Sequence, residues 1–297
     1  MNRIGEFAGL GAAFCWSFTA LFFTAAGRRI GAFKVNVLRI TLAVLFLSAT
    51  LWLTAGSNPK LWFEGGRGWL LVWSGIIGLV IGDGALFRAF VLLGARRTTL
   101  MLSLVPIFTA LIAWTLMGEA LPLTGWLGIL LTVGGVGWVA MEGGADGDRQ
   151  EGTKLVWFGL ALVASLCQAV GLILAKAGMG ADMNPMAATL VRMAGAGVVL
   201  WMMALVSSVR RELRELFQQP RAMMLVLGGA VTGPFVGVWL SLVSVKLIEA
   251  GIAATLMATV PIWVIPWVWI LHRERTSPRA ILGTIAAVVG VAVLMNR

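Results

Sequence analysis

Residues 98–128 read TTLMLSLVPIFTALIAWTLMGEALPLTGWLG, and residues 253–283 read AATLMATVPIWVIPWVWILHRERTSPRAILG. The second stretch repeats the first at a shift of about 155 residues. Three matches mark this register: Pro106 with Pro261, Glu119 with Glu274, and Gly128 with Gly283. Both stretches contain apolar runs of the length that crosses a lipid bilayer. The pattern therefore predicts a membrane protein built from two copies of one unit.

The repeat continues toward the start of each half. The 155-residue register pairs two glycine motifs of the form Gly-x-x-x-Gly, Gly78 to Gly82 with Gly233 to Gly237. Further upstream the shift falls to about 150–153 residues, which pairs Arg39 with Arg192. The two predicted domains are residues 1–146 and 152–297.

The composition excludes a soluble protein. Of the 297 residues, 59% are hydrophobic and only 12% are charged, with a mean hydropathy of +0.93. Soluble domains have about 45–50% apolar and about 25% charged residues. Ten spans of roughly 20 residues would leave only short connections, so no separate catalytic domain fits.

Charges and clusters of proline and glycine divide the chain into apolar segments. We expect ten spans, at residues 7–26, 32–54, 68–93, 98–117, 122–141, 153–175, 186–208, 222–247, 251–271 and 278–295. Lipid satisfies no backbone hydrogen bond, so these spans must be helices and the fold class is an all-α membrane protein. Five spans per half is an odd number, which forces the two halves to enter the bilayer from opposite sides. Inverted repeats of this kind are typical of secondary transporters, whose substrate site lies near the midplane.

The segment Met117-Gly118-Glu119-Ala120-Leu121-Pro122-Leu123-Thr124-Gly125-Trp126-Leu127-Gly128, with the glycine-rich span after it, resembles the end of the EamA module of the drug/metabolite transporter superfamily. The resemblance covers nearly the whole chain and implies two five-span modules around a central cavity. By size and plan the chain is similar to the YddG-type amino acid exporters. Two departures from the family pattern are His272-Arg273-Glu274, where Gly usually precedes Glu, and Arg96-Arg97 in a connection that is usually small and polar.

Basic residues are distributed unevenly between the two ends of the predicted spans. About 14 Lys and Arg follow odd-numbered spans and about 6 lie on the opposite side, which by the positive-inside rule places both termini outside the cytoplasm. The family resemblance implies termini inside, and both alternatives stay open here. The formal charge of +10 is attributed to lipid contact and topology rather than to nucleic acid.

Asp83 is the only acidic residue well inside an apolar segment. Ionisable groups at such depth are costly and are functional candidates. Asp83 can bind a substrate ammonium group or carry a coupling proton, and the alternative is a structural pair with Arg39 or Arg88. The inverted topology suggests a further hypothesis, in which two latches join the halves: Arg39 with Glu274 and Arg192 with Glu119. Snorkelling of both arginines to the membrane surface is the alternative.

The matched prolines and glycines are assigned to gating and packing. Pro106 and Pro261 each remove a backbone hydrogen bond in mid-span, which can kink the helix or free a carbonyl toward a cavity. The glycine motifs are read as close-packing surfaces. These predicted gating and packing residues are Gly78, Gly82, Pro106, Gly233, Gly237 and Pro261.

The family pattern assigns the first, third, fourth, sixth, eighth and ninth spans to the cavity. Their deep aromatic, sulfur-containing and polar residues predict an apolar pocket with few polar groups, although lipid-facing packing is the alternative for each Trp. The predicted substrate-binding residues are Trp16, Ser17, Asp83, Met101, Ser103, Gln168, Trp239, Met257, Thr259 and Trp263. Such a pocket suits an apolar or aromatic amino acid.

The sequence thus predicts a bacterial inner-membrane transporter that exports small metabolites, most simply apolar or aromatic amino acids, by alternating access. Exporters of other metabolites or drugs, and a receptor or scaffold that transports nothing, are the alternatives. No hydrolase, metalloprotease or P-loop motif occurs, so we expect neither enzymatic activity nor a cofactor or metal. The expected partners are a small-molecule substrate and lipid, not nucleic acid, and a monomer is the simplest expectation.

Overall fold

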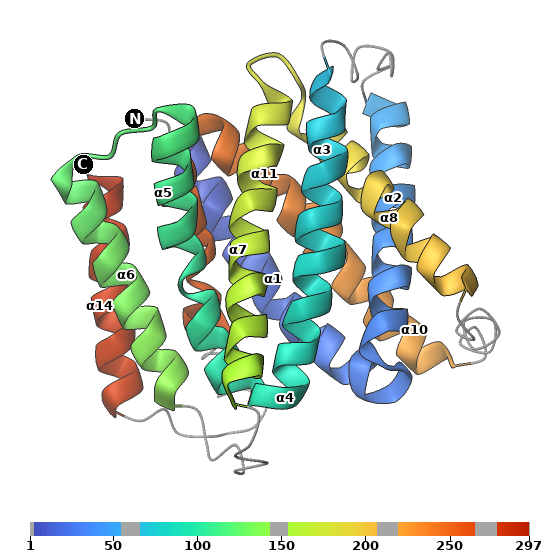
Figure 1. The fold of residues 1–297 in the computed structure, drawn as a ribbon, viewed down its shortest axis with the longest axis horizontal. Coiled ribbons are helices and arrows are strands. Elements are labelled where there is room, and N and C mark those ends of the chain that lie inside the picture. The colour runs from blue at the N-terminus through green and yellow to red at the C-terminus, as the bar shows by residue number, and fades with distance from the viewer. Residues whose placement is uncertain (1–2, 55–65, 143–153, 207–218, 265–277, 297) are drawn as a thin grey trace.

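The computed structural model describes residues 3–54, 66–142, 154–206, 219–264 and 278–296, and within these ranges every regular element is a helix (Figure 1). Six helical segments are long and apolar enough to cross a membrane, and shorter apolar helices of 10–17 residues accompany them. The predicted all-helical class is therefore confirmed. The total of ten spans stays a prediction, and the predicted domain boundary at residues 146–152 lies outside the described ranges.

Each half consists of a series of helices in the same order. The first half contains α1 (Arg3–Ile30), α2 (Ala32–Thr54), α3 (Arg67–Gly75), η2 (Ile76–Gly82), α4 (Asp83–Leu102), α5 (Val105–Met117) and α6 (Leu123–Glu142). The second half contains α7 (Lys154–Met179), α8 (Pro185–Val206), α10 (Pro220–Ala230), η5 (Val231–Gly237), α11 (Val238–Leu247), α12 (Ala250–Met257) and α14 (Pro278–Met295). The segments η2 and η5 are π-helical and continuous with the α-helices on either side.

The two halves run in opposite directions. Figure 1 shows both chain ends at the same end of the helical bundle. From that end α1 runs away, whereas α7, the first helix of the second half, runs toward it. The helices α6 and α14 are likewise antiparallel. This is the inversion that an odd number of spans per half requires.

Glycines bring α6 and α14 into close contact. A Cβ atom added to Gly135 would lie 2.5 Å from the carbonyl oxygen of Gly283, and one added to Gly290 would lie 2.9 Å from that of Gly128. The 155-residue shift converts the first of these pairs into the second. The contact between the halves is therefore symmetric about a two-fold axis, and the absence of side chains lets the backbones meet.

The π-helical segments occupy equivalent places in the two repeats. Adding 155 to the bounds of η2 gives the bounds of η5. Each segment begins two residues before the first glycine of its Gly-x-x-x-Gly motif and ends at the second. π-Helical turns are rare and are found mostly at functional sites, so a matched pair at the centre of two long helices is informative.

Each π-helical segment packs against the first helix of the other half. In η2, a Cβ atom on Gly78 would lie 3.8 Å from the Cα of Gly171, in α7. In η5, a Cβ atom on Gly233 would lie 2.7 Å from the side chain of Thr19, in α1. The hydroxyl groups of Thr19 and Thr232 also share a hydrogen bond of 3.0 Å. The repeats therefore interlock, and the predicted close-packing motifs lie at their interface.

The fourth and ninth segments of the sequence prediction are interrupted at matched positions. The interruptions are at residues 103–104, between α4 and α5, and at residues 258–259, after α12. Pro106 and Pro261 each lie two residues beyond an interruption, at the start of a new helical stretch. Proline is well accepted there because its missing N–H would have no partner. The prolines thus begin helices rather than kink continuous ones.

The predicted connection at residues 94–97 needs correction. These residues belong to α4, which continues to Leu102. Ala95, Arg96 and Arg97 have good helix propensity, and a helix satisfies its backbone hydrogen bonds locally. The charged pair Arg96-Arg97 was therefore a misleading indicator of a break in the helix.

Replacing Gly135 with Leu should disrupt the contact between the halves. Its Cβ atom would lie 2.5 Å from the backbone nitrogen of Ala287, so α6 and α14 must separate. We expect the midpoint of thermal unfolding in detergent to fall by about 5 °C or more, as for overpacking in a rigid core. Gly134→Leu is the matched control, because a Cβ atom at Gly134 meets nothing within 4 Å. Equal midpoints for the two variants would contradict the proposed contact.

Candidate functional site

Asp83 lies at the end of η2, where α4 begins, and only 6% of it is exposed. Its carboxylate accepts a hydrogen bond from Nη2 of Arg39, on α2, and the two form an ion pair. The other carboxylate oxygen accepts a hydrogen bond of 2.8 Å from Nε2 of Gln168, on α7. Groups from both halves of the protein therefore hold the acidic side chain that the sequence singled out.

Arg39 is held on several sides. Its Nε donates a 2.8 Å hydrogen bond to the side-chain oxygen of Asn36, one turn earlier on α2. Its guanidinium carbon lies 5.4 Å from the ring centroid of Phe23 and 5.7 Å from that of Phe87, within the range of cation–π attraction. Asn36 in turn donates to the carbonyl of Leu79 in η2, at 3.4 Å. These contacts fix the position of one charge beside the π-helical segment.

Arg192, the repeat counterpart of Arg39, lies beside Gly75 and Gly78 and is 4% exposed. A Cβ atom on Gly75 would lie 2.0 Å from the carbonyl oxygen of Arg192, and one on Gly78 would lie 2.9 Å from its Nη2. Small residues in the third span thus leave the room that this arginine occupies. The nearby carboxylate of Asp83 attracts Arg192 electrostatically. Arg39 therefore pairs with this carboxylate and Arg192 is a second cation near it, and we call Arg39, Asp83, Gln168 and Arg192 the charge cluster.

The aromatic and sulfur-containing residues predicted to line a pocket have different neighbours. Trp16 packs against both large buried clusters of the protein, next to Gly237. Met257 is 5% exposed and belongs to one of these clusters, whereas Met101 packs against a separate small one. Trp263 makes an edge-to-face contact with Phe14, with ring centroids 5.3 Å apart. Trp239 is half-buried on α11.

Two of the predicted polar side chains donate hydrogen bonds to backbone carbonyls three residues earlier in the chain. The hydroxyl of Ser17 donates to the carbonyl of Phe14, and that of Thr259 donates to the carbonyl of Leu256, both at 2.6 Å. Ser103 is buried at the interruption before α5. Of the predicted polar positions, Gln168 is the one whose side chain contacts Asp83. Asn36 was not predicted, although a polar residue one turn before Arg39 in an apolar span could have indicated it.

The hypothesis of two arginine–glutamate latches needs correction. Arg39 pairs with Asp83, and Glu274, its predicted partner, lies outside the described residues, so that latch stays a prediction. Glu119 pairs with Lys176, at 2.5 Å between the charged atoms, and not with Arg192. The sequence order of the spans could not show that both arginines lie beside the third span, Arg39 at Asp83 and Arg192 at Gly75 and Gly78.

Glu119 nevertheless joins the two halves. Helix α5 ends at the end of the bundle that carries both termini, and Gly118, which Glu119 follows, ends it in a left-handed conformation (φ 68°) that suits glycine. The carboxylate of Glu119 accepts a 2.7 Å hydrogen bond from the backbone N–H of Ala250, at the start of α12. Lys176 also donates to the carbonyl of Ile248, at 2.7 Å. These bonds join the end of α5, in the first half, to α7 and to the start of α12, in the second half.

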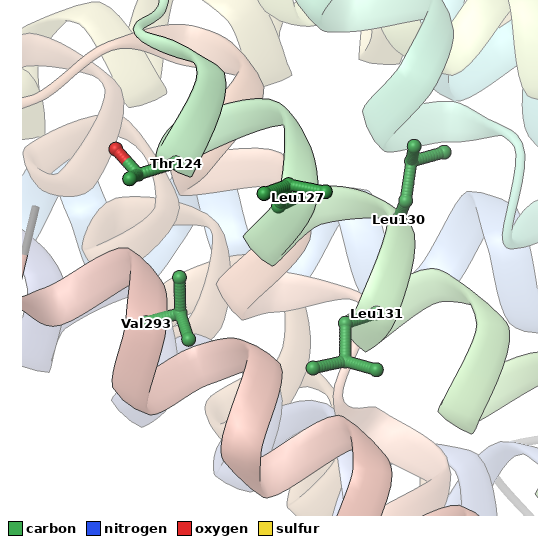
Figure 2. A pocket seen from close by; sticks show the side chains of 5 residues that line it. All are labelled: Thr124, Leu127, Leu130, Leu131 and Val293. Carbon is green, nitrogen blue, oxygen red and sulfur yellow. The ribbon is translucent and has the colours of Figure 1, made fainter.

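A groove of about 560 Å³ lies elsewhere, on the outer surface of the α6–α14 pair (Figure 2). It is lined by Thr124, Leu127, Leu130, Leu131 and Val293. Its leucines are 39–55% exposed, as expected for side chains that face lipid. The groove offers one hydroxyl and no charge, so it is not a candidate substrate site.

The ion pair between Glu119 and Lys176 should be measurable by a double-mutant cycle. Both side chains are 16% exposed, so we expect a coupling free energy of about 1–2 kcal/mol in the thermal or chemical unfolding of the detergent-solubilised protein. Glu119→Gln and Lys176→Met are suitable variants, because Gln retains an acceptor for the N–H of Ala250. If the effects of the two substitutions on stability are strictly additive, the ion pair contributes nothing to stability.

Comparisons with known proteins identify relatives of both halves. A family model, the EamA-like transporter family, matches residues 3–141 and again residues 155–296. An uncharacterized transporter of Synechocystis sp. is 30% identical over 190 residues. The matched residues cover 59% of this chain and 54% of the relative, so the chain matches about half of that protein's length. A protein crystal structure superposes with a TM-score of 0.78 at 16% identity, over 99% of this chain and 96% of the other, which shows a shared fold. With both halves matched, the chain belongs to the EamA-like transporter family and is a multi-pass membrane protein.

Proposed function

We propose that this protein is a secondary transporter of two inverted five-span repeats that exports apolar or aromatic amino acids across the bacterial inner membrane. One observation carries the proposal: a buried charge cluster in which Arg39 and Asp83 of the first half meet Gln168 and Arg192 of the second. Buried charges in a membrane protein are costly and are typical of substrate or ion pathways. The interface between inverted repeats is also where transporters bind their substrates.

The matched irregularities of the helices support alternating access. Both halves have a π-helical segment and a helix interruption at positions related by the 155-residue shift. Discontinuous helices with such symmetry are typical of carriers in which the two repeats exchange conformations. Contacts between the halves at the end that carries both termini, such as Glu119 with Lys176, would have to break for the protein to open there.

The chemistry of the cluster supports an amino acid as the substrate. A zwitterion needs both a positive and a negative partner, and the cluster contains both. Trp16 packs against two buried apolar clusters, one containing Met257 and the other containing Leu79 of η2. Aromatic and apolar surroundings with a few polar groups suit a substrate that has an apolar side chain.

Two roles for Asp83 are compatible with this function. The carboxylate can bind the substrate's ammonium group directly, or it can take up a proton in exchange for substrate. The sequence contains no P-loop, so a concentration or proton gradient would drive export. Proton exchange makes transport depend on a pH gradient, whereas facilitated exit does not.

Flux through reconstituted liposomes tests the proposal. We expect the purified protein to equilibrate radiolabelled phenylalanine or leucine across the bilayer, with the other apolar and aromatic amino acids competing. The assay is run with and without a pH gradient to separate proton exchange from facilitated exit. Protein-free liposomes are the control. Binding of the amino acids without equilibration of the label would instead indicate a receptor.

Replacing Asp83 with Asn tests whether its carboxylate works in transport. The variant should lose transport, and the unpaired Arg39 should lower stability by about 3–5 kcal/mol. The double variant Asp83→Asn/Arg39→Gln removes both charges and should recover much of the thermal stability while remaining inactive. Recovery of transport in the double variant would show that the ion pair serves only the fold.

A further inference from the structure

Arg39 and Arg192 are equivalent by sequence repeat but differ in their partners. Arg39 has a carboxylate, an amide oxygen and two aromatic rings around it. Arg192 is 4% exposed, and within the described residues its Nε has no hydrogen-bond partner. The carboxylate near Arg192 is that of Asp83, which already accepts hydrogen bonds from Arg39 and Gln168. Arg39 therefore has an ion-pair partner and a bonded Nε, whereas the buried Nε of Arg192 has no partner among the described residues.

The second half retains the arginine and lacks the groups that would satisfy it. The residue equivalent to Asp83 is Val238, which is buried. The residue equivalent to Asn36 is Thr189, whose hydroxyl donates to the carbonyl of Pro185. The residue equivalent to Gln168 is Trp16. The second copy thus offers Arg192 neither an acid nor an amide at these positions.

The room that Arg192 occupies is provided by glycines. Gly75 and Gly78 give it space next to η2, and a methyl group at either position would collide with it. A guanidinium group stays protonated in proteins, so it cannot lose its charge to avoid the cost of burial. A buried cation with an unused donor is a strong binding group for a carboxylate, which arginine can hold through two parallel hydrogen bonds.

We propose that Arg192 binds the carboxylate of the transported molecule, and that this contact restricts the substrates to small carboxylic acids, including amino acids. The inference rests on the proposed transport function and extends it to a named residue and functional group. Binding of a carboxylate would give the charge cluster two negative groups for two guanidinium groups. Amines without a carboxylate would leave the positive charge unbalanced and should be excluded.

Binding can be measured without transport, by the thermal unfolding midpoint of the detergent-solubilised protein in the presence of three probes. Phenylalanine carries both charged groups, 3-phenylpropionate lacks the ammonium group, and phenethylamine lacks the carboxylate. We expect phenylalanine and 3-phenylpropionate to stabilise the wild-type protein, and phenethylamine not to do so. In Arg192→Gln the apparent affinity for both carboxylates should fall by about tenfold or more, with a smaller loss in Arg192→Lys.

Stability without ligand separates a binding role from a structural one. Removing an unpaired buried cation should leave the midpoint of Arg192→Gln equal to or above that of the wild type, whereas Arg39→Gln should lower it by breaking a pair. Arg221→Gln is the matched control, because this exposed arginine at the start of α10 lies outside the cluster. A destabilised Arg192→Gln with unchanged affinity for 3-phenylpropionate would overturn the inference.

The two proposals fail in different ways. If wild-type protein moves amino acids and Arg192→Gln moves them with the same apparent affinity, the role of Arg192 is wrong and the transport function stands. If 3-phenylpropionate binds through Arg192 but no amino acid crosses the membrane, the carboxylate site stands and the amino acid exporter is wrong. If phenethylamine binds as tightly as 3-phenylpropionate, the restriction to carboxylic acids is wrong.

Discussion

A polar group inside a lipid bilayer must find its partner within the protein, because the hydrocarbon offers none. The backbone meets this requirement by forming helices throughout the described ranges. Asp83 meets it through Arg39 on α2 and Gln168 on α7. Since one of these partners belongs to each half, the same requirement that folds the spans also ties the two halves together at their centre.

Glycine determines how closely the halves approach. In the α6–α14 pair, glycines let the two backbones touch, and the contact repeats itself under the two-fold relation. In η2 and η5, glycines admit the neighbouring first helix of the other half. Interlocked helices of this kind would resist separation, while the interruptions at residues 103–104 and 258–259 are places where two spans are not continuous helices.

The symmetry of the backbone is not matched by symmetry of charge. The two repeats place an arginine at equivalent positions, yet only the first repeat has an acidic residue after its π-helical segment. A perfectly symmetric protein would contain two neutral pairs and no spare donor. The asymmetry leaves the buried Arg192 with unused hydrogen-bonding capacity at the interface of the halves. Binding specificity in a duplicated protein can arise in this way, when one copy lacks a partner that the other copy has.

The sequence by itself determined the helical class, the duplication and the presence of a buried acid at Asp83, because these follow from local properties. The length of an apolar run, a shift in register and a single acid in an apolar segment can all be read along the chain. Only the tertiary structure decided which arginine meets Asp83, that Glu119 pairs with Lys176, and that Asn36 takes part. Those choices depend on which helices pack together and on which glycines leave room for a neighbour, and neither is local to one stretch of sequence.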